Sequence, residues 1–211
     1  MAGIAGFGSA PVDFLALGDS YTIGEGVDDE ERWPVQLAAA LRAQGIAIGH
    51  PQIIARSGWT TDELSADIDA EDAHGNLQPR YDLVSLQIGV NNQYRGRSVE
   101  DYGVEFSGLF ERAVAFAGGD PTRVLVLSIP DWGVTPFAQA RGSDPAQVAR
   151  EIDRYNDLAA TLCSQRGATW VDITDLTRRP DLVHELVADG LHPSARMYAL
   201  WVDRIRDKIR P

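Results

Sequence analysis

Residues 14–26 read Phe14-Leu-Ala-Leu-Gly-Asp-Ser-Tyr-Thr-Ile-Gly-Glu-Gly26, an apolar run that ends abruptly in a Gly-Asp-Ser turn. A short apolar run before a tight polar turn is typical of a buried strand in a parallel sheet. Such a strand would present Ser20 at its carboxyl end, the edge where open α/β sheets bind ligands. Ser20 is therefore a candidate nucleophile, although Asp19 and Ser20 are also common helix caps.

The rest of the chain alternates between strand-like and helix-like segments, which predicts βαβ units and a parallel sheet covered by helices on both faces. With right-handed crossovers, the expected fold is a flavodoxin-like three-layer α/β/α sandwich, its five strands in the order 2-1-3-4-5. Residues 130–142 show no clear period and are expected to form a long loop. The strands after the first are expected at Pro51–Ala55, Asp82–Gly89, Arg123–Ile129 and Thr169–Val171.

Length and charge restrict the classes of protein to consider. The 211 residues are expected to form a single domain, residues 1–211, with residues 1–10 as a frayed lead-in. The net charge of −12 argues against nucleic acid or an anionic membrane as a partner, because both bind basic patches. Nothing in the sequence indicates the oligomeric state.

The lack of a recognisable targeting signal and the low cysteine content predict a cytoplasmic protein. No apolar run approaches the roughly 20 residues of a membrane span, and the start of the chain lacks the pattern of a secretion signal. The single cysteine, Cys163, excludes an internal disulfide and fits a reducing compartment. Cys163 is expected to pack in the core.

Three polar or small residues follow the first three expected strands. Ser20 follows strand one, Gly58 follows strand two and Asn91 follows strand three. In the order 2-1-3 these strand ends are neighbours, so a hydroxyl, a glycine N–H and a side-chain amide should converge. A nucleophile and an oxyanion hole have these parts, since donors must face the oxygen on which negative charge develops.

A serine hydroxyl also needs a base. Of the four histidines, His50, His74 and His184 are interpreted as surface or capping residues. His192 differs because Asp189 precedes it by three residues in a loop framed by glycine and proline. That spacing lets a carboxylate orient an imidazole for proton transfer, although Asp189 could instead only form a turn with Gly190.

Four blocks of sequence, in order, resemble the SGNH (GDSL-type) hydrolase family. They are Gly18-Asp-Ser-Tyr21, Gly58, Gly89-Val-Asn-Asn92 and Asp189-Gly-Leu-His-Pro193, and the similarity spans residues 13–205. The resemblance implies a flavodoxin-like sandwich that hydrolyses esters or thioesters without a cofactor or metal. Two positions depart from the family pattern: Tyr21 replaces a leucine, and Asn92 replaces an aspartate, which removes a charge beside Asn91.

The resemblance also implies residue roles. Ser20 would be the nucleophile, with its own N–H, the Gly58 N–H and the Asn91 side chain forming the oxyanion hole. His192 would be the general base and acid, oriented by Asp189. Independently of the resemblance, the apolar residues Trp132, Pro136 and Phe137 are candidate substrate-binding residues, although packing over the sheet edge would explain them equally well. Trp59, beside Gly58, is a further candidate.

The substrate is less well defined than the chemistry. The expected substrate is a small-molecule ester, either a short acyl ester or a lysophospholipid or thioester, and a carbohydrate O-acetyl esterase is the alternative. A non-catalytic or flavin-binding flavodoxin-like protein is the alternative from another class, but flavin binding gives no role to Asp189 and His192. A metallohydrolase is disfavoured because no histidine or carboxylate pair has ligand spacing.

Overall fold

The computed structural model describes residues 10–209 and contains a five-stranded parallel sheet. Its order, β2-β1-β3-β4-β5, confirms the predicted 2-1-3-4-5 arrangement. Except for Ala10, the expected lead-in lies outside the described residues. The strands are β1 (Phe14–Gly18), β2 (Gln52–Ala55), β3 (Leu83–Gln87), β4 (Val124–Leu127) and β5 (Thr169–Val171).

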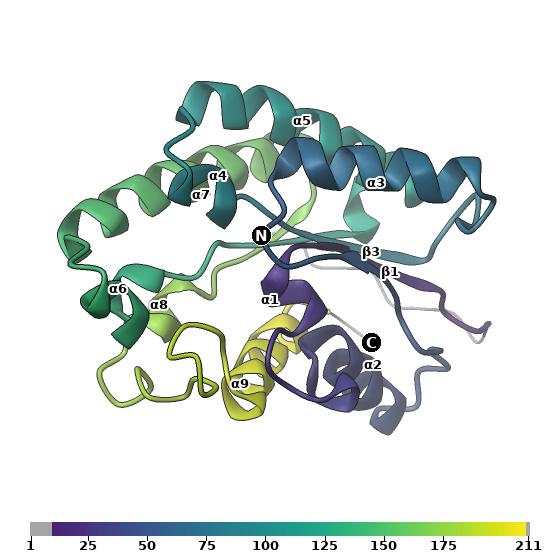
Figure 1. Ribbon diagram of the computed structural model, residues 1–211. Coiled ribbons are helices and arrows are strands. Elements are labelled where there is room, and N and C mark those ends of the chain that lie inside the picture. The colour runs from purple at the N-terminus through teal and green to yellow at the C-terminus, as the bar shows by residue number, and fades with distance from the viewer. Residues whose placement is uncertain (1–9, 210–211) are drawn as a thin grey trace.

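Helices cover both faces of the sheet, which confirms the three-layer α/β/α prediction. In Figure 1, α2 and α9 lie below the sheet, and α3, α5 and α7 lie above it. The longer helices are α2 (Trp33–Ala43), α3 (Thr61–Ala73), α5 (Val99–Phe116), α7 (Pro145–Arg166) and α9 (Ala195–Arg206). The short helices are α1 (Ser20–Ile23), α4 (Val90–Tyr94), α6 (Pro136–Ala140), α8 (Thr174–Thr177), and the 3-10 turns η1 (Asp29–Glu31), η2 (Pro121–Arg123) and η3 (Trp132–Val134).

Local sequence explains where these elements begin and end. All five residues of β1 are buried, as expected of a strand with neighbours on both sides and helices on both faces. Helix α7 begins with the Asp144 cap and Pro145 at its first position, and it ends at Gly167 in the left-handed conformation. Cys163 lies fully buried on this helix, as predicted.

The expected loop at residues 130–142 is instead two short helices, η3 and α6. The Asp131 side chain accepts a hydrogen bond from the Gly133 N–H at 2.9 Å, and the Thr135 hydroxyl accepts one from the Ala138 N–H at 3.3 Å. Asp131 therefore caps the start of η3. Thr135 caps the start of α6, with Pro136 at its first position. The prediction of a loop was wrong because helices this short show no hydrophobic period in the sequence.

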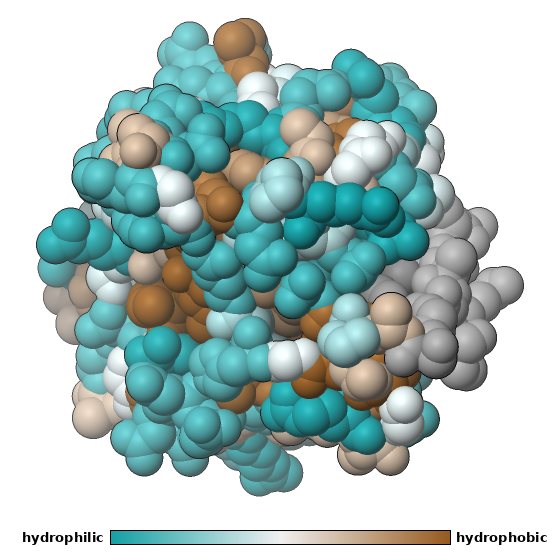
Figure 2. Space-filling view, turned by 90° about the vertical axis from the view of Figure 1, so that its right-hand side faces the viewer, coloured by the Kyte–Doolittle hydropathy of each residue, from teal (hydrophilic) through white to brown (hydrophobic). Residues whose placement is uncertain are grey.

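The surface offers no helix suited to a lipid bilayer among residues 10–209: none is both long and apolar enough to span one. The face in Figure 2 is mostly hydrophilic, and its hydrophobic residues form small, separated patches. Single exposed apolar groups of this kind are normal on a folded protein.

Gly18→Ala should destabilise the protein. A Cβ at residue 18 would lie 2.6 Å from the Gln87 backbone oxygen and would also collide with Thr22. Overpacking of this kind costs about 1–3 kcal/mol. Gly108→Ala is the matched control, because residue 108 is an exposed site in α5 with open space around it and should gain about 0.5–1 kcal/mol. Urea unfolding of both variants measures the effect, and a neutral Gly18→Ala would contradict the packing argument.

Candidate active site

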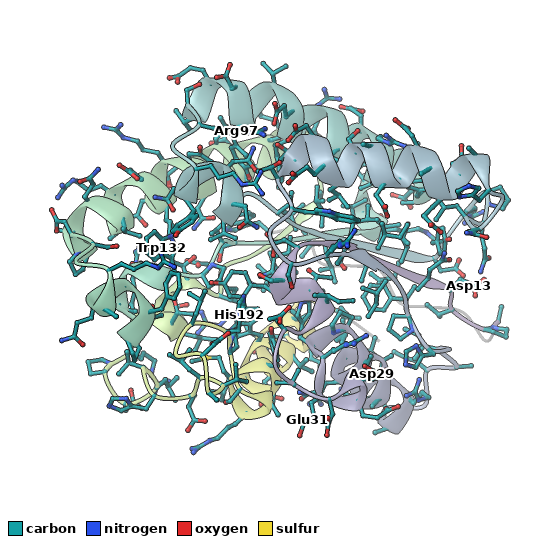
Figure 3. The ribbon with its side chains drawn as sticks, viewed as in Figure 1. Asp13, Asp29, Glu31, Arg97, Trp132 and His192 are labelled. Atoms are coloured by element: carbon teal, nitrogen blue, oxygen red, sulfur yellow. The ribbon has the colours of Figure 1, made fainter. Side chains whose placement is uncertain are left out.

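The carboxyl ends of the three neighbouring strands lead into one cleft. Ser20 is the first residue of α1, Gly58 lies in the turn after β2, and Asn91 lies in α4 after β3. All three line a cleft of about 140 Å³, together with His192. Figure 3 shows His192 and Trp132 on the same side of the molecule, far from Asp13 at the amino end of β1. The structure therefore brings together the residues whose convergence was expected from the strand order.

Ser20 is positioned by the cap of its own short helix. The Asp19 carboxylate accepts a hydrogen bond from the Tyr21 N–H at 3.1 Å, so Asp19 is the N-cap of α1. Ser20 is 5% exposed and borders the cleft. The capping interpretation is therefore correct for Asp19, and it leaves the Ser20 hydroxyl free of the capping role.

Gly58 is required by its backbone conformation. Its φ of +87° lies in the left-handed region, where a residue with a side chain would have a strained backbone. The space around it is open: only Arg95 Nη2, at 3.9 Å, would be near an added Cβ. The Gly58 carbonyl accepts a hydrogen bond from Arg95 Nη2 at 2.7 Å. Steric crowding is thus not the reason for glycine here.

Asn91 connects its helix to the turn after β2. Its Nδ2 donates a hydrogen bond to the Trp59 carbonyl at 2.9 Å. A side-chain amide nitrogen carries two hydrogens, so one remains for a ligand in the cleft. The hydrogen bond therefore fixes the orientation of the amide without using all of its donor capacity.

The side chain of Asn92 is hydrogen-bonded to two neighbouring residues. Asn92 is fully buried, and its Oδ1 accepts a hydrogen bond from the Thr61 N–H at 3.1 Å. Its Nδ2 donates to Thr61 Oγ1 at 2.6 Å and to Glu105 Oε2 at 3.3 Å. An aspartate could not donate to the Glu105 carboxylate and would repel it. Asn92 thus ties α4 to the start of α3, and Glu105 carries the nearby negative charge.

Asp189 and His192 form a close pair. His192 Nδ1 lies 2.6 Å from Asp189 Oδ2, and Asp189 Oδ1 accepts hydrogen bonds from the backbone N–H groups of Leu191 and His192 at 2.8 and 3.0 Å. Partial burial raises the pKa of Asp189, but these hydrogen bonds lower it more, so the net pKa lies below its ordinary value. Asp189 therefore makes both the expected turn and the expected contact with the imidazole.

The His192 ring sits on the cleft side of this pair. Its side chain is 12% exposed, and the ring centroid lies 5.5 Å from that of Tyr21. The other histidines, His50, His74 and His184, lie exposed on the surface, in agreement with their interpretation.

Three aromatic side chains form a wall of the cleft. Trp132 and Phe137 line it as expected, with ring centroids 6.3 Å apart. Tyr94, which the sequence analysis missed, packs against both, with ring centroids 5.3 Å from Trp132 and 6.4 Å from Phe137. Tyr94 comes three residues after Asn91 on a helix, a spacing that places both on one face and could have identified it. Trp132 is held by a hydrogen bond from its Nε1 to Gln93 at 2.7 Å.

Two of the expected wall residues do not line the cleft. The Trp59 ring is half-buried against the hydrophobic core, and the residue contributes its backbone carbonyl to Asn91 instead. Pro136 is exposed at the start of α6 and faces Gly190. In both cases the neighbouring residue in the chain, Gly58 or Phe137, lines the cleft instead.

Asp19→Asn should show a pH-dependent gain in stability. Burial raises the pKa of Asp19 from 3.8 to about 7, so the folded protein binds a proton there that the unfolded chain releases above about pH 4. The wild type therefore loses stability as pH rises from 4 to 7. Asparagine keeps the cap acceptor without a charge. Relative to the wild type, its free energy of unfolding should rise by up to about 4 kcal/mol between pH 4 and pH 8. Urea unfolding at several pH values measures this effect. If the argument were wrong, the difference in free energy of unfolding between Asp19→Asn and the wild type would be the same at every pH.

Comparison with known proteins agrees with this fold and these motifs. A model of the GDSL-like lipase/acylhydrolase family matches residues 16–200. The structure is similar to TesA, at 20% identity and a TM-score of 0.71, with 94% of this chain and 98% of TesA covered. A search of curated proteins found no match.

Two further solved structures have a similar fold. The psychrotrophic esterase EstA from Pseudoalteromonas sp., in a structure inhibited by monoethylphosphonate, is 19% identical with a TM-score of 0.67 over 93% of this chain and 95% of EstA. Phospholipase A1 from Streptomyces albidoflavus NA297 is 19% identical with a TM-score of 0.67 over 94% of this chain and all of that chain (100%). The family match covers most of the sequence, so the chain belongs to the GDSL-like lipase/acylhydrolase family and is a serine hydrolase acting on ester bonds.

Proposed function

We propose that this protein hydrolyses short-chain carboxylic esters through an acyl-enzyme on Ser20, with His192 as general base and acid and Asp189 as its orienting carboxylate. The observation that carries the proposal is the shared cleft of Ser20, Gly58, Asn91 and His192. The 2.6 Å contact between His192 Nδ1 and Asp189 Oδ2 supports it further.

In the acylation step, the Asp189 carboxylate accepts a hydrogen bond from the Nδ1–H of His192, which leaves the Nε2 lone pair of His192 to take the Ser20 proton. Ser20 Oγ then bonds to the ester carbonyl carbon, and the carbonyl oxygen becomes an oxyanion. The N–H groups of Ser20 and Gly58 and the free Nδ2 hydrogen of Asn91 are the donors that would stabilise it. The tetrahedral intermediate expels the alcohol, which leaves with the proton that His192 carried.

In the deacylation step, water replaces the alcohol. His192 Nε2 takes a proton from water as its oxygen attacks the acyl carbon, and the same donors stabilise the second oxyanion. Collapse of this intermediate breaks the bond to Ser20 Oγ, and His192 returns the proton to that oxygen. The products are a carboxylic acid and the free enzyme, so no cofactor enters the balance.

The size and lining of the cleft favour a short acyl group. Its volume of about 140 Å³ is close to that of an engineered cavity of roughly 150 Å³ that holds benzene. Clefts for drug-sized ligands are larger, about 300–1,000 Å³. The aromatic wall of Tyr94, Trp132 and Phe137 suits an aliphatic chain of a few carbons. Lysophospholipids, thioesters and acetylated sugars are the other substrates to compare against p-nitrophenyl esters in a panel.

Ser20→Ala should abolish turnover of p-nitrophenyl butyrate, because the acyl-enzyme cannot form. The expected loss in kcat is at least about 10⁴-fold. A fluorophosphonate probe should label the wild type on Ser20 and leave the variant unlabelled, which also separates an enzyme from a non-catalytic protein. Ser107→Ala, on the outer helix α5, is the control and should keep wild-type rates. Wild-type turnover by Ser20→Ala would end the assignment.

Asn91→Ala should lower kcat by about 10²–10³-fold, the usual effect of losing one oxyanion donor. Because Asn91 also holds the Trp59 carbonyl, the thermal midpoint of unfolding must be measured alongside the rate. The proposal expects a loss of rate far larger than any loss of folded protein. A roughly twofold decrease in kcat would instead make Asn91 a structural residue. Asn76→Ala, in the exposed connection after α3, is the matched control.

A further inference from the structure

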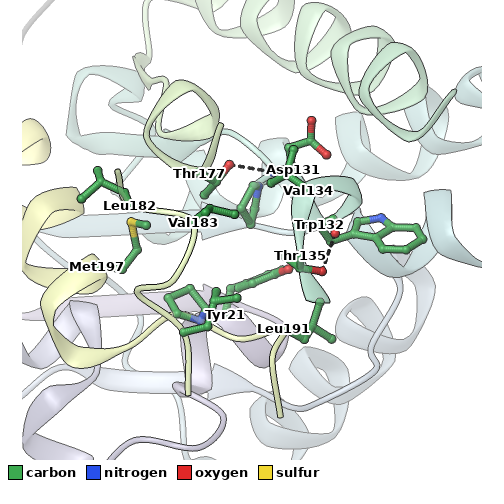
Figure 4. Close-up of a pocket in the computed structure, with 13 residues that line it drawn as sticks. Tyr21, Asp131, Trp132, Val134, Thr135, Thr177, Leu182, Val183, Leu191 and Met197 are labelled. Atoms are coloured by element: carbon green, nitrogen blue, oxygen red, sulfur yellow. Dashed lines mark hydrogen bonds between the residues drawn. The ribbon is translucent and has the colours of Figure 1, made fainter. Parts of the chain in front are cut away.

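A second, smaller cavity lies next to the cleft. It shares three lining residues with the cleft, Tyr21, Trp132 and Leu191, so their side chains form the partition between the two spaces. Figure 4 shows Trp132 and Leu191 on one side of this inner cavity, with Leu182 and Met197 on the other. The partition therefore lies beside the residues that line the cleft with Ser20.

The inner cavity is built mainly from aliphatic groups. Leu182, Val183, Leu186 and Met197 line it from the chain between α8 and α9 and from α9 itself, and Val134 lines it from η3. Its volume is about 20 Å³, close to that of one water-sized sphere and too small for an alkyl chain. An aliphatic chain that extends from the cleft toward the inner cavity therefore meets the partition.

Two partition residues also serve other contacts. Trp132 donates a hydrogen bond to buried Gln93 at 2.7 Å, and the Tyr21 ring packs between His192 and Trp201 at centroid distances of 5.5 and 6.2 Å. Changing either side chain would disturb the site itself. Leu191 contributes only an aliphatic side chain to the partition, so it is the member whose size can vary independently.

The backbone around Leu191 is held on both sides. Its own N–H donates to Asp189 Oδ1 at 2.8 Å. The Gly190 carbonyl accepts from the Phe137 N–H at 3.1 Å, and the His192 carbonyl accepts from the Val187 N–H at 2.9 Å. Shortening the Leu191 side chain removes none of these hydrogen bonds, so the His192 ring keeps its support.

We propose that Leu191 is the residue that limits acyl-chain length, by closing the cleft off from the inner aliphatic cavity. This inference rests on the proposed ester hydrolysis at Ser20. The partition consists of aromatic and aliphatic side chains, so it is the part of the cleft lining that suits the aliphatic end of the acyl group. A smaller residue at position 191 joins the two spaces and admits a longer chain.

The test compares kcat/KM for p-nitrophenyl butyrate and p-nitrophenyl octanoate in the wild type, Leu191→Val and Leu191→Ala. The octanoate-to-butyrate ratio should be low in the wild type and should rise in the order Val, then Ala. A gain of at least about tenfold is expected for Leu191→Ala, since one methylene in a hydrophobic pocket changes kcat/KM by roughly 10–200-fold. A wild type that prefers octanoate, or a ratio that stays within about twofold across the series, would overturn the inference.

Leu182→Ala is the matched control. Leu182 lines the inner cavity and not the cleft, so its truncation enlarges the cavity while the partition stays closed. The ratio should then stay within about twofold of the wild type. An equal rise in Leu182→Ala and Leu191→Ala would mean general loosening rather than a partition, and it would refute the role of Leu191.

A second pair of substrates tests which part of the ester meets Leu191. Octyl acetate carries the long chain on the alcohol and ethyl octanoate carries it on the acyl group, and Leu191→Ala should improve only the latter. Improvement of octyl acetate alone would overturn the acyl assignment.

The outcomes also distinguish the inference from the proposed function. If butyrate turnover depends on Ser20 but the octanoate-to-butyrate ratio is unchanged, only the Leu191 inference is refuted. If no turnover depends on Ser20, the proposed function is refuted and the inference with it.

Discussion

The parallel register of β1 with its two neighbours is the constraint on which the site depends. Gly18 pairs with Ala55 of β2 on one side and with Gln87 of β3 on the other, so the three strands end at the same level. The chain then needs only a few residues in each turn to reach Ser20, Gly58 and Asn91. The absence of a side chain at Gly18 allows α1 to start directly against β3. Backbone hydrogen bonding of the sheet thus sets the spacing of the cleft residues.

Buried polar side chains behind this edge then hold the turns in place. Gln87 accepts hydrogen bonds from Trp33 Nε1 at 3.1 Å and from the Thr22 hydroxyl at 3.4 Å, which joins β3 to α2 and α1. Asn92 does the same between α4 and α3. A buried amide without partners costs free energy, so each satisfied amide favours one arrangement of its loops over others. The asparagine that departs from the family pattern is therefore part of the support of the cleft.

The sequence was informative wherever a local pattern and a topological rule acted together. Apolar runs located the strands, and right-handed crossovers then predicted their order. Side-chain direction in short turns depends on packing that no local pattern encodes. Trp59 was therefore expected in the cleft although it contributes only its carbonyl, and Tyr94 was missed. The short helices at residues 130–142 escaped detection because a single turn has no period. The catalytic roles of Ser20, Asp189 and His192 stay predictions.

In the segment that carries Asp189 and His192, the position of the imidazole and the size of the apolar end of the cleft depend on different atoms. The backbone of this segment is fixed by hydrogen bonds to Phe137 and within the turn itself, and these bonds position the imidazole whatever side chain stands at residue 191. The side chain of Leu191, in contrast, takes part in none of these hydrogen bonds and lines both the cleft and the inner cavity. The orientation of the imidazole is thus set by the main chain of this segment and the Asp189 carboxylate, and the extent of the apolar end of the cleft is set by the Leu191 side chain. Because the two depend on different atoms, substrate size can change without displacing the base.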